Sequence, residues 1–141
     1  MTHFAHVLVA DQDAETAMQQ VDILNKAGYK AYPVSVKERF RPFVERLLVL
    51  HWQGNQIITL GTEAFKWFDP YGRRGEVNGF FRRGDRFETS LQVTLRAVDD
   101  LGMEHQKIVT LSPLPHPSPL NQRYYAQFPQ MLQNRLGAIA F

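Results

Sequence analysis

A histidine held between prolines is the side chain of this 141-residue sequence best placed to do chemistry. His116 lies in the run LSPLPHPSPLN, residues 111–121, where four of the chain's eight prolines fall within seven residues. Proline fixes its own φ and restricts the residue before it, so we expect a stiff, extended backbone. An imidazole fixed where a strand ends can stabilise negative charge on a departing group without reorganising. The alternative interpretation is a loop histidine that only bonds to backbone groups.

Carboxylates follow the first apolar run of the chain. The run Phe4–Ala10 predicts a buried strand, and Asp11, Gln12 and Asp13 come directly after it. Asp13, with Gln12 beside it, is a candidate catalytic residue that takes a proton from water as a general base. Asp11 or Asp13 can instead cap the helix that follows, and N-cap preferences favour this second interpretation.

The elements that position these residues can be read from hydrophobic periodicity. The first half predicts a helix closed by Gly28, a strand at Lys30–Val34, and a capping box at Ser35–Glu38 before a helix that starts at Pro42. The apolar positions of these two helices are Ala14, Ala17, Met18, Val21 and Leu24 in the first, and Phe40, Phe43, Val44, Leu47 and Leu48 in the second.

The second half predicts a central strand, a hairpin and a terminal helix. In chain order we expect a strand at Gln56–Leu60, a short aromatic helix at Glu63–Phe68, an exposed Gly/Arg-rich loop at 69–85, hairpin strands at Phe87–Val98 and Lys107–Leu111, and a helix at Gln130–Leu136 with Pro129 before it and Gly137 as its stop. Alternating strands and helices imply a parallel sheet covered on both faces. We therefore expect one domain, residues 1–141, built as a three-layer α/β/α sandwich around a mainly parallel four- to five-stranded sheet.

Composition excludes several classes of function. The apolar fraction of 44% and charged fraction of 21% are those of an ordinary soluble domain. There are no cysteines, which removes disulfides, thiol nucleophiles and iron–sulfur clusters. The sequence holds no apolar run of membrane-spanning length and no secretion signal at its start, so we expect a cytoplasmic protein without a membrane partner. His3, His6, His51 and His105 lack metal-ligand spacing, and we expect neither a metal nor another cofactor.

Positive charge is concentrated in the second half of the chain. Five arginines crowd the Gly-rich stretch, Arg73, Arg74, Arg82, Arg83 and Arg86, and residues 105–141 contain no acidic side chain. Such a distribution suits a polyanion, because phosphate contacts supply most of the non-specific affinity for nucleic acids. A merely solvated surface is the alternative.

Two segments resemble a known family. His116-Pro117-Ser118-Pro119-Leu120, entered from a strand, resembles the second signature of the uracil-DNA glycosylase superfamily. The segment Gln56–Phe65, a strand ending in Leu-Gly before a short helix with Ala64, is similar to another conserved part of that family. Together with residues 107–136 the resemblance covers roughly the C-terminal two thirds of the chain. It implies the family's fold, a cluster-free branch, and a DNA partner, single- or double-stranded, that contains a damaged base.

The resemblance also implies roles for individual residues. His116 would stabilise the departing base, while Pro117, Pro119 and Ser118 would hold the DNA backbone and Leu120 would fill the space of the flipped nucleotide. Asn121 and Arg123 would complete the nucleic-acid contacts, and Gly61, Gln12 and Phe65 would line the pocket. The aromatic residues Trp67, Phe68, Tyr124 and Tyr125 could also stack a base, although such residues are more often core.

The resemblance leaves the reaction open. The family's first signature is a strand running into Gly-x-Asp-Pro or Gly-x-Asn-Pro, and Ala10-Asp11-Gln12-Asp13-Ala14 lacks both the Gly and the Pro. We therefore expect either an enzyme that excises uracil or a related base, or a degenerate or partial member that binds nucleic acid without cleaving it. A small-molecule-binding α/β domain is the third interpretation.

Overall fold

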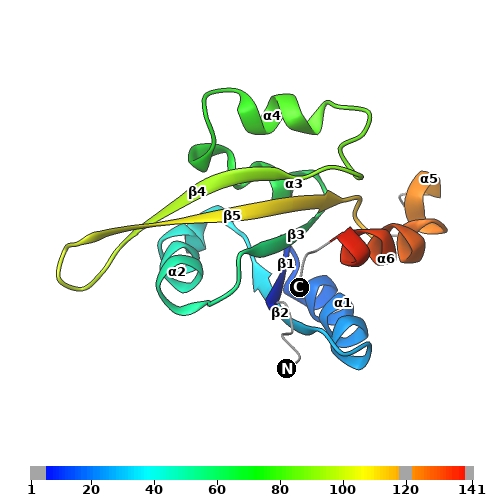
Figure 1. Ribbon diagram of the computed structural model, residues 1–141, viewed down its shortest axis with the longest axis horizontal. Helices are drawn as coiled ribbons and strands as arrows, with labels where there is room; N and C mark the ends of the chain where they lie inside the picture. Colours follow the sequence, from blue (N-terminus) through cyan, green and yellow to red (C-terminus); the bar gives the residue numbers. More distant parts are fainter. Residues whose placement is uncertain (1–5, 118–121, 139–141) are drawn as a thin grey trace.

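A five-stranded, mainly parallel sheet forms the centre of the computed structural model, which describes residues 6–117 and 122–138 (Figure 1). The strand order is β2-β1-β3-β5-β4, and only the β4–β5 pair at one edge is antiparallel. The strands are β1 (His6–Asp11), β2 (Lys30–Ser35), β3 (Gln56–Leu60), β4 (Leu91–Val98) and β5 (Glu104–Leu114). The predicted α/β class and mainly parallel sheet are confirmed.

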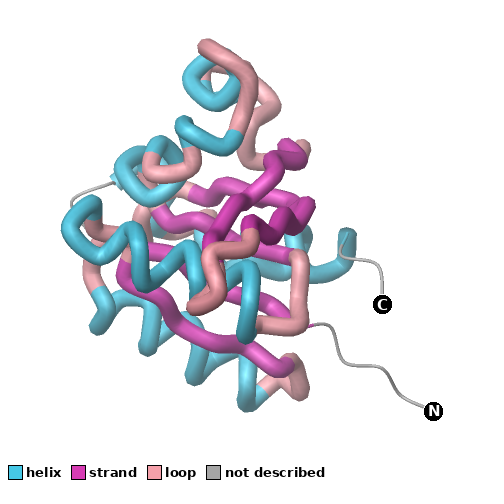
Figure 2. Tube along the Cα trace, turned by 90° about the vertical axis from the view of Figure 1, so that its left-hand side faces the viewer, coloured by secondary structure: helices cyan, strands magenta, loops and turns pink. Residues whose placement is uncertain are grey.

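Helices cover both faces of the sheet, and Figure 2 shows the strands lying between them. The side chains of β1 alternate, so Val7 and Val9 pack on one face while Leu8 and Ala10 pack on the other. The first face is covered by α1 (Ala14–Lys26) and α6 (Phe128–Ala138). The second is covered by α2 (Arg41–Arg46) with its π-helical extension Leu47–His51, α3 (Thr62–Lys66) and α4 (Glu76–Phe81). A further short helix, α5 (Gln122–Tyr125), precedes α6.

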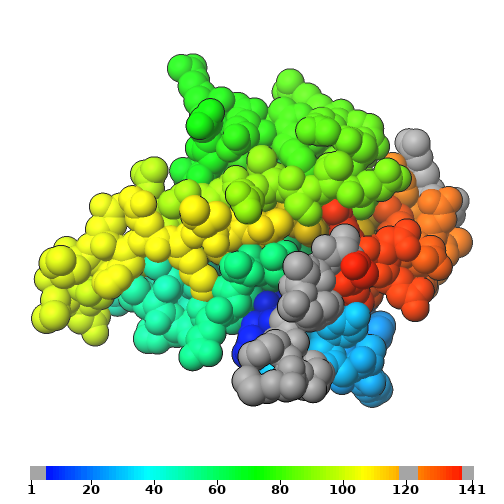
Figure 3. Space-filling view, viewed as in Figure 1, coloured from blue at the N-terminus to red at the C-terminus, as the bar shows by residue number. Residues whose placement is uncertain are grey.

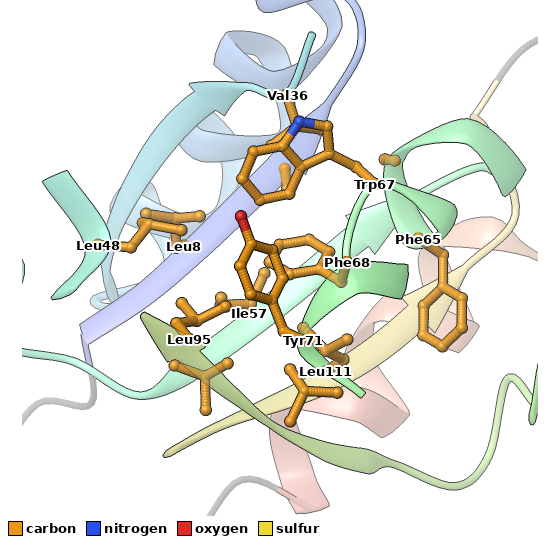
Figure 4. Packing of buried hydrophobic residues seen from close by; sticks show 14 of the residues in the cluster. Leu8, Val36, Leu48, Ile57, Phe65, Trp67, Phe68, Tyr71, Leu95 and Leu111 are labelled. Atoms are coloured by element: carbon orange, nitrogen blue, oxygen red, sulfur yellow. The ribbon is translucent and has the colours of Figure 1, made fainter. Parts of the chain in front are cut away.

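Aromatic side chains dominate the second face. Trp67, Phe68 and Tyr71 pack against one another with ring centroids 4.9–6.3 Å apart, over the central strands (Figure 4). Burying a large apolar side chain contributes about 1.5–3 kcal/mol, so this cluster is a main source of the free energy of folding. Trp67 and Phe68 connect α3 to the turn Asp69–Tyr71, and Tyr71 is the last residue of that turn.

The stretch 69–85 is not the exposed loop that its Gly and Arg content predicted. It contains a 3₁₀ turn, Asp69–Tyr71, and helix α4, whose Val77 and Phe80 are buried. In Figure 3 this segment, drawn green, forms a ridge above the sheet. The prediction failed because two apolar residues three positions apart are enough to anchor a short helix once a sheet face is available to cover.

Three local predictions are also wrong. Met18 is 47% exposed, and on the second helix Phe40, Phe43 and Leu47 are exposed while Val44 and Leu48 are buried, because each helix buries only the narrow stripe facing the sheet. Ser35 remains in β2, where its hydroxyl donates to the carbonyl of Gln12, so no capping box forms. Gly137 does not stop the last helix, which continues to Ala138.

The β4–β5 hairpin projects beyond the rest of the molecule (Figures 1 and 3). Its register pairs Val98 with Glu104 and Leu91 with Leu111, so β5 is longer than predicted and β4 begins later. Asp99 closes the turn by accepting from the backbone N–H groups of Leu101 and Met103, both at 2.9 Å. In the part of the chain that the structure describes, no helix has the length and apolarity needed to cross a bilayer.

Candidate functional site

The carboxyl ends of β1, β3 and β5 meet at one edge of the sheet, because these strands are parallel neighbours. Asp11 is the last residue of β1, Gly61 follows β3, and His116 lies two residues beyond β5. Ligands of open α/β sheets bind at this edge. The fold therefore brings together three residues that are far apart in the sequence.

Asp11 and His116 form an ion pair at this edge. The distance from Asp11 Oδ2 to His116 Nε2 is 3.3 Å, and the Asp11 side chain is 2% exposed against 39% for His116. Asp11 Oδ1 accepts from the backbone N–H of Asp13 at 3.0 Å, whereas Oδ2 is buried without a hydrogen bond in the described residues. Burial raises the pKa of Asp11, and the Asp13 amide and the His116 charge only partly oppose this rise.

Gly61 allows the loop that contains His116, residues 115–117 and here called the histidine loop, to cross the end of β3. Its φ of +87° is one that residues with a side chain rarely adopt, and its N–H donates to the Leu114 carbonyl at 2.9 Å. A Cβ at this position would lie 3.3 Å from His116 Cβ and 3.6 Å from Cδ2. The imidazole therefore packs directly over the backbone of Gly61. Gly61, predicted to line a pocket, is thus in contact with His116, the predicted catalytic residue.

Asp13 lies in the same turn but has a different environment. Its side chain caps α1 by accepting from the Glu15 N–H at 3.1 Å and from the Thr16 hydroxyl at 2.9 Å. The bond from Thr16, with that from Glu15, lowers the pKa of Asp13, and its carboxylate is exposed. The capping interpretation of Asp13 is confirmed, and the carboxylate paired with His116 is Asp11.

The two other predicted pocket residues, Gln12 and Phe65, lie in different environments. Gln12 donates its side-chain N–H to the carbonyl of Val36 and lines a cavity of about 280 Å³. Phe65 is fully buried, with its ring centroid 5.7 Å from that of Phe80 and 5.1 Å from that of Phe81. Phe65 therefore packs against α4 and has no exposed surface in this structure.

The predicted nucleic-acid contacts lie mostly beyond what can be described. Pro117 directly follows His116 and is partly buried. Ser118, Pro119, Leu120 and Asn121 lie outside the described residues, as does the side chain of Arg123.

Arg135 is a residue of this edge that the sequence analysis missed. It projects from α6, is 4% exposed, and its Nη2 donates to the carbonyls of Pro113 (2.9 Å) and Arg86 (2.7 Å). Burial lowers the pKa of this guanidinium to about 10. Arg135 thus ties the end of β5 to the segment before β4. The available signal was its position within the apolar stripe of α6, three residues after Leu132.

Part of the arginine-rich stretch reaches the same edge. The carbonyl of Arg86 is held by Arg135, and the Arg86 guanidinium lies 4.4 Å from the centroid of Phe87. Arg83 forms a two-point ion pair with Asp85, and Arg82 is exposed. The backbone of this stretch is therefore joined, through Arg135, to the strand that leads to His116.

The edge combines an imidazole that packs over Gly61, a buried carboxylate 3.3 Å from its Nε2, and a backbone without a side chain at Gly61. This arrangement can present a hydrogen-bond donor to a group that develops negative charge. A scan against protein-family models and searches of curated proteins and of solved structures found no match to this chain.

Proposed function

We propose that this chain is a DNA glycosylase-like domain with a uracil-DNA glycosylase-like fold, which flips uracil or a related damaged base and hydrolyses its N-glycosidic bond. The contact between Gly61 and His116 is the observation that supports it best. This contact joins the two segments that resemble the superfamily, although they are separated in the sequence. Chance similarity of two short motifs gives no reason for them to meet at the ligand-binding edge of a sheet.

His116 is the proposed catalytic residue. As the bond between the sugar C1′ and the base nitrogen breaks, its electron pair moves to the base and spreads onto a base carbonyl oxygen. An imidazole N–H that donates to this oxygen stabilises the leaving group. Asp11 acts as a positioning residue, since its buried Oδ2 faces Nε2 and sets the orientation of the ring.

Water completes the reaction by adding to C1′ and losing one proton. The exposed and readily ionised Asp13 is the proposed proton acceptor, in the same turn as Asp11. The products are the free base and an abasic sugar. Arg82 and Arg86 are the proposed contacts to the DNA backbone, which fix the position of the strand without reading its sequence.

A cleavage assay tests the proposal. Single- and double-stranded oligonucleotides carrying one uracil are incubated with the chain, treated with alkali, and separated by size. We expect strand cleavage at the uracil, and a loss of at least about 100-fold in rate for His116→Ala, the size typical of acid–base groups. His105→Ala is the matched control, because His105 also pairs with an aspartate but lies in the projecting hairpin.

The remaining outcomes separate the alternatives. Binding that weakens steeply with salt, without cleavage of any lesion, indicates the degenerate family member that binds nucleic acid. Weak binding that hardly depends on salt contradicts both nucleic-acid interpretations and leaves the small-molecule-binding domain.

A further inference from the structure

Among the described residues, β4 pairs only with β5, so one long edge of β4 is free. The register shows which backbone groups lie on that edge. Thr110 of β5 donates its N–H to Asn55 on the β3 side at 2.8 Å, so Gln92, which lies opposite Thr110, forms no hydrogen-bonded pair with it. Hydrogen-bonded and other pairs alternate along an antiparallel ladder. The N–H and C=O groups of Gln92, Thr94 and Arg96 therefore point away from β5.

The end of this edge near the hairpin turn is closed, and the middle is open. The carbonyl of Val98 points outward by the same alternation, and it accepts from Arg46 Nε at 3.1 Å. In the described part of the chain, no other group hydrogen-bonds to the outward backbone groups of residues 92, 94 and 96. Proteins usually protect such an edge, because its unpaired groups can pair with another strand. Here the stretch Gln92–Arg96 is left unprotected.

A groove of about 580 Å³ follows this open stretch. β4 contributes side chains from both of its faces, Val93 from one and Gln92 and Thr94 from the other, so the groove follows the edge of the strand and not one face of the sheet. The opposite wall includes Arg73 and Glu76 of the segment 69–85. Figure 1 shows this segment alongside β4, on the side away from β5.

The segment 69–85 limits what the groove can hold. A second copy of this chain that paired through β4 would bring its own segment 69–85 to the same edge, because a two-fold axis joins the same surface of both copies. Each of these segments would then occupy the space that the β4 strand of the other copy needs. A single extended peptide meets no such conflict, since it needs only the width of one strand, about 4.8 Å from β4.

The side chains of the groove favour acidic residues on that peptide. Arg73 and Arg96 are exposed, and neither guanidinium has an ion pair or a hydrogen bond with the described residues. Glu76 accepts from the backbone N–H of Arg73 at 3.2 Å, so the acid of this wall already has a partner. Ile108 lies opposite Thr94 and is 60% exposed, which offers the peptide an apolar contact.

We propose that the stretch Gln92–Arg96 of β4 binds an extended acidic segment of a partner protein, which extends the sheet by one strand. Main-chain hydrogen bonds to residues 92, 94 and 96 supply the affinity, and acidic side chains beside Arg96 supply the specificity. No residue of this groove belongs to the Asp11–His116 site, so the proposal is independent of the proposed function.

Peptide binding tests the proposal. A short fluorescent peptide of alternating glutamate and valine, blocked at both ends, is titrated with the chain and followed by fluorescence anisotropy. Two further peptides carry N-methyl groups, one on every glutamate and the other on every valine. Alternate residues of a strand turn their N–H groups to opposite edges, so one of these two should lose at least about 10-fold in affinity and the other should bind normally.

Variants of β4 give the complementary result. Thr94→Pro removes an outward N–H and keeps the bonds to β5, so it should weaken binding at least about 10-fold. Arg96→Glu should bind the glutamate peptide at least about 10-fold more weakly and a lysine–valine peptide more tightly than the wild type does. Lys30→Glu is the matched control, because Lys30 is an exposed base on β2, the strand at the opposite edge of the sheet.

Several results would overturn the proposal. Strand pairing uses one edge of the peptide, so losses in neither or in both N-methylated peptides contradict it. Equal losses in Arg96→Glu and Lys30→Glu, or displacement of the peptide by a single-stranded oligonucleotide, indicate attraction by net charge alone. A dimer of the chain that Thr94→Pro abolishes identifies a second copy as the occupant. The peptide series and Arg96→Glu decide the question even if Thr94→Pro does not fold.

Discussion

The two ends of β5 each carry an aspartate–histidine pair. At its start, in the projecting hairpin, Asp99 Oδ2 lies 2.8 Å from His105 Nε2, and both side chains are partly exposed. Beyond its end, Asp11 Oδ2 lies 3.3 Å from His116 Nε2, and the carboxylate is buried. The hairpin pair is the shorter of the two, and the cavity of about 340 Å³ beside it, whose wall includes Arg46, Val98 and Glu104, lies at the opposite end of β5 from the carboxyl edge of the sheet.

The two pairs differ in how far the aspartate carboxylate is removed from solvent. The bond to His105, together with the Met103 and Leu101 amides, lowers the pKa of Asp99. At the other end burial outweighs the bonds and raises the pKa of Asp11. The partly exposed Asp99 carboxylate, which accepts from two backbone N–H groups, stabilises a turn, whereas the buried Asp11 carboxylate carries a desolvation cost, as carboxylates at functional sites commonly do. The distance within a pair therefore says less about its role than the environment of its carboxylate.

Activity should distinguish the pairs most strongly. Asp11→Asn should lower the rate of uracil excision by about 100-fold and shift its pH profile, because the imidazole loses the charge that orients it. Asp99→Asn should leave the rate within about twofold of wild type. Rates and pH profiles from the cleavage assay, with circular dichroism to check folding, provide the measurement. Equal losses in the two variants would remove the distinction.

The hydrogen bonds by which Arg135 anchors the end of β5 should contribute to the free energy of unfolding. Arg135→Met leaves the carbonyls of Pro113 and Arg86 without their donor and should reduce the free energy of unfolding by about 2–3 kcal/mol. Arg96→Met, on the exposed side of β4, should change it by less than about 0.5 kcal/mol. Urea denaturation measures both. A neutral result for Arg135→Met would mean that the end of β5 is held by other contacts.

Glycine substitutions separate backbone strain from contact with His116. Gly61 and Gly28 both have positive φ, +87° and +98°, so an alanine at either should cost about 1 kcal/mol or more. At Gly28 a Cβ meets nothing within 4 Å, but at Gly61 it would press on His116. Thermal unfolding should show similar losses, and only Gly61→Ala should also reduce excision, by several-fold. Full activity in Gly61→Ala would show that the ring position is not critical.

The pH dependence of stability should run in opposite directions for the two aspartates. The pKa of folded Asp11 is raised above its ordinary value of 3.8, so its contribution to stability is present below pH 3.8 and is lost as pH rises through the folded pKa. The pKa of folded Asp99 is lowered, so its contribution is present above pH 3.8 and is lost as pH falls through the folded pKa.

Melting temperatures between pH 2 and pH 8, for wild type and the two Asn variants, give the comparison. Asp11→Asn should gain relative to wild type as pH rises, and Asp99→Asn should lose. Parallel curves would contradict the difference in solvation between the two pairs.

Much of the fold could be predicted because local sequence signals mark the beginning and end of its elements. β3 has the predicted bounds, Gln56–Leu60, since a short β-branched run between polar residues has few other solutions. Asp13 and Gly28 mark the two ends of α1 as expected. α4 was missed because its stability comes from packing on the sheet and not from its own Gly-rich sequence.

For the site, the sequence by itself determined a proline-braced histidine after a strand, carboxylates after another strand, and a glycine after a third. Only the tertiary structure decided that Asp11, and not Asp13, meets His116, because strand order and the alternation of side chains determine which groups face one another. The same holds for the contacts by which Arg135 anchors the end of β5. Burial and hydrogen-bond partners belong to the packed chain, and no residue carries them in its own type or spacing.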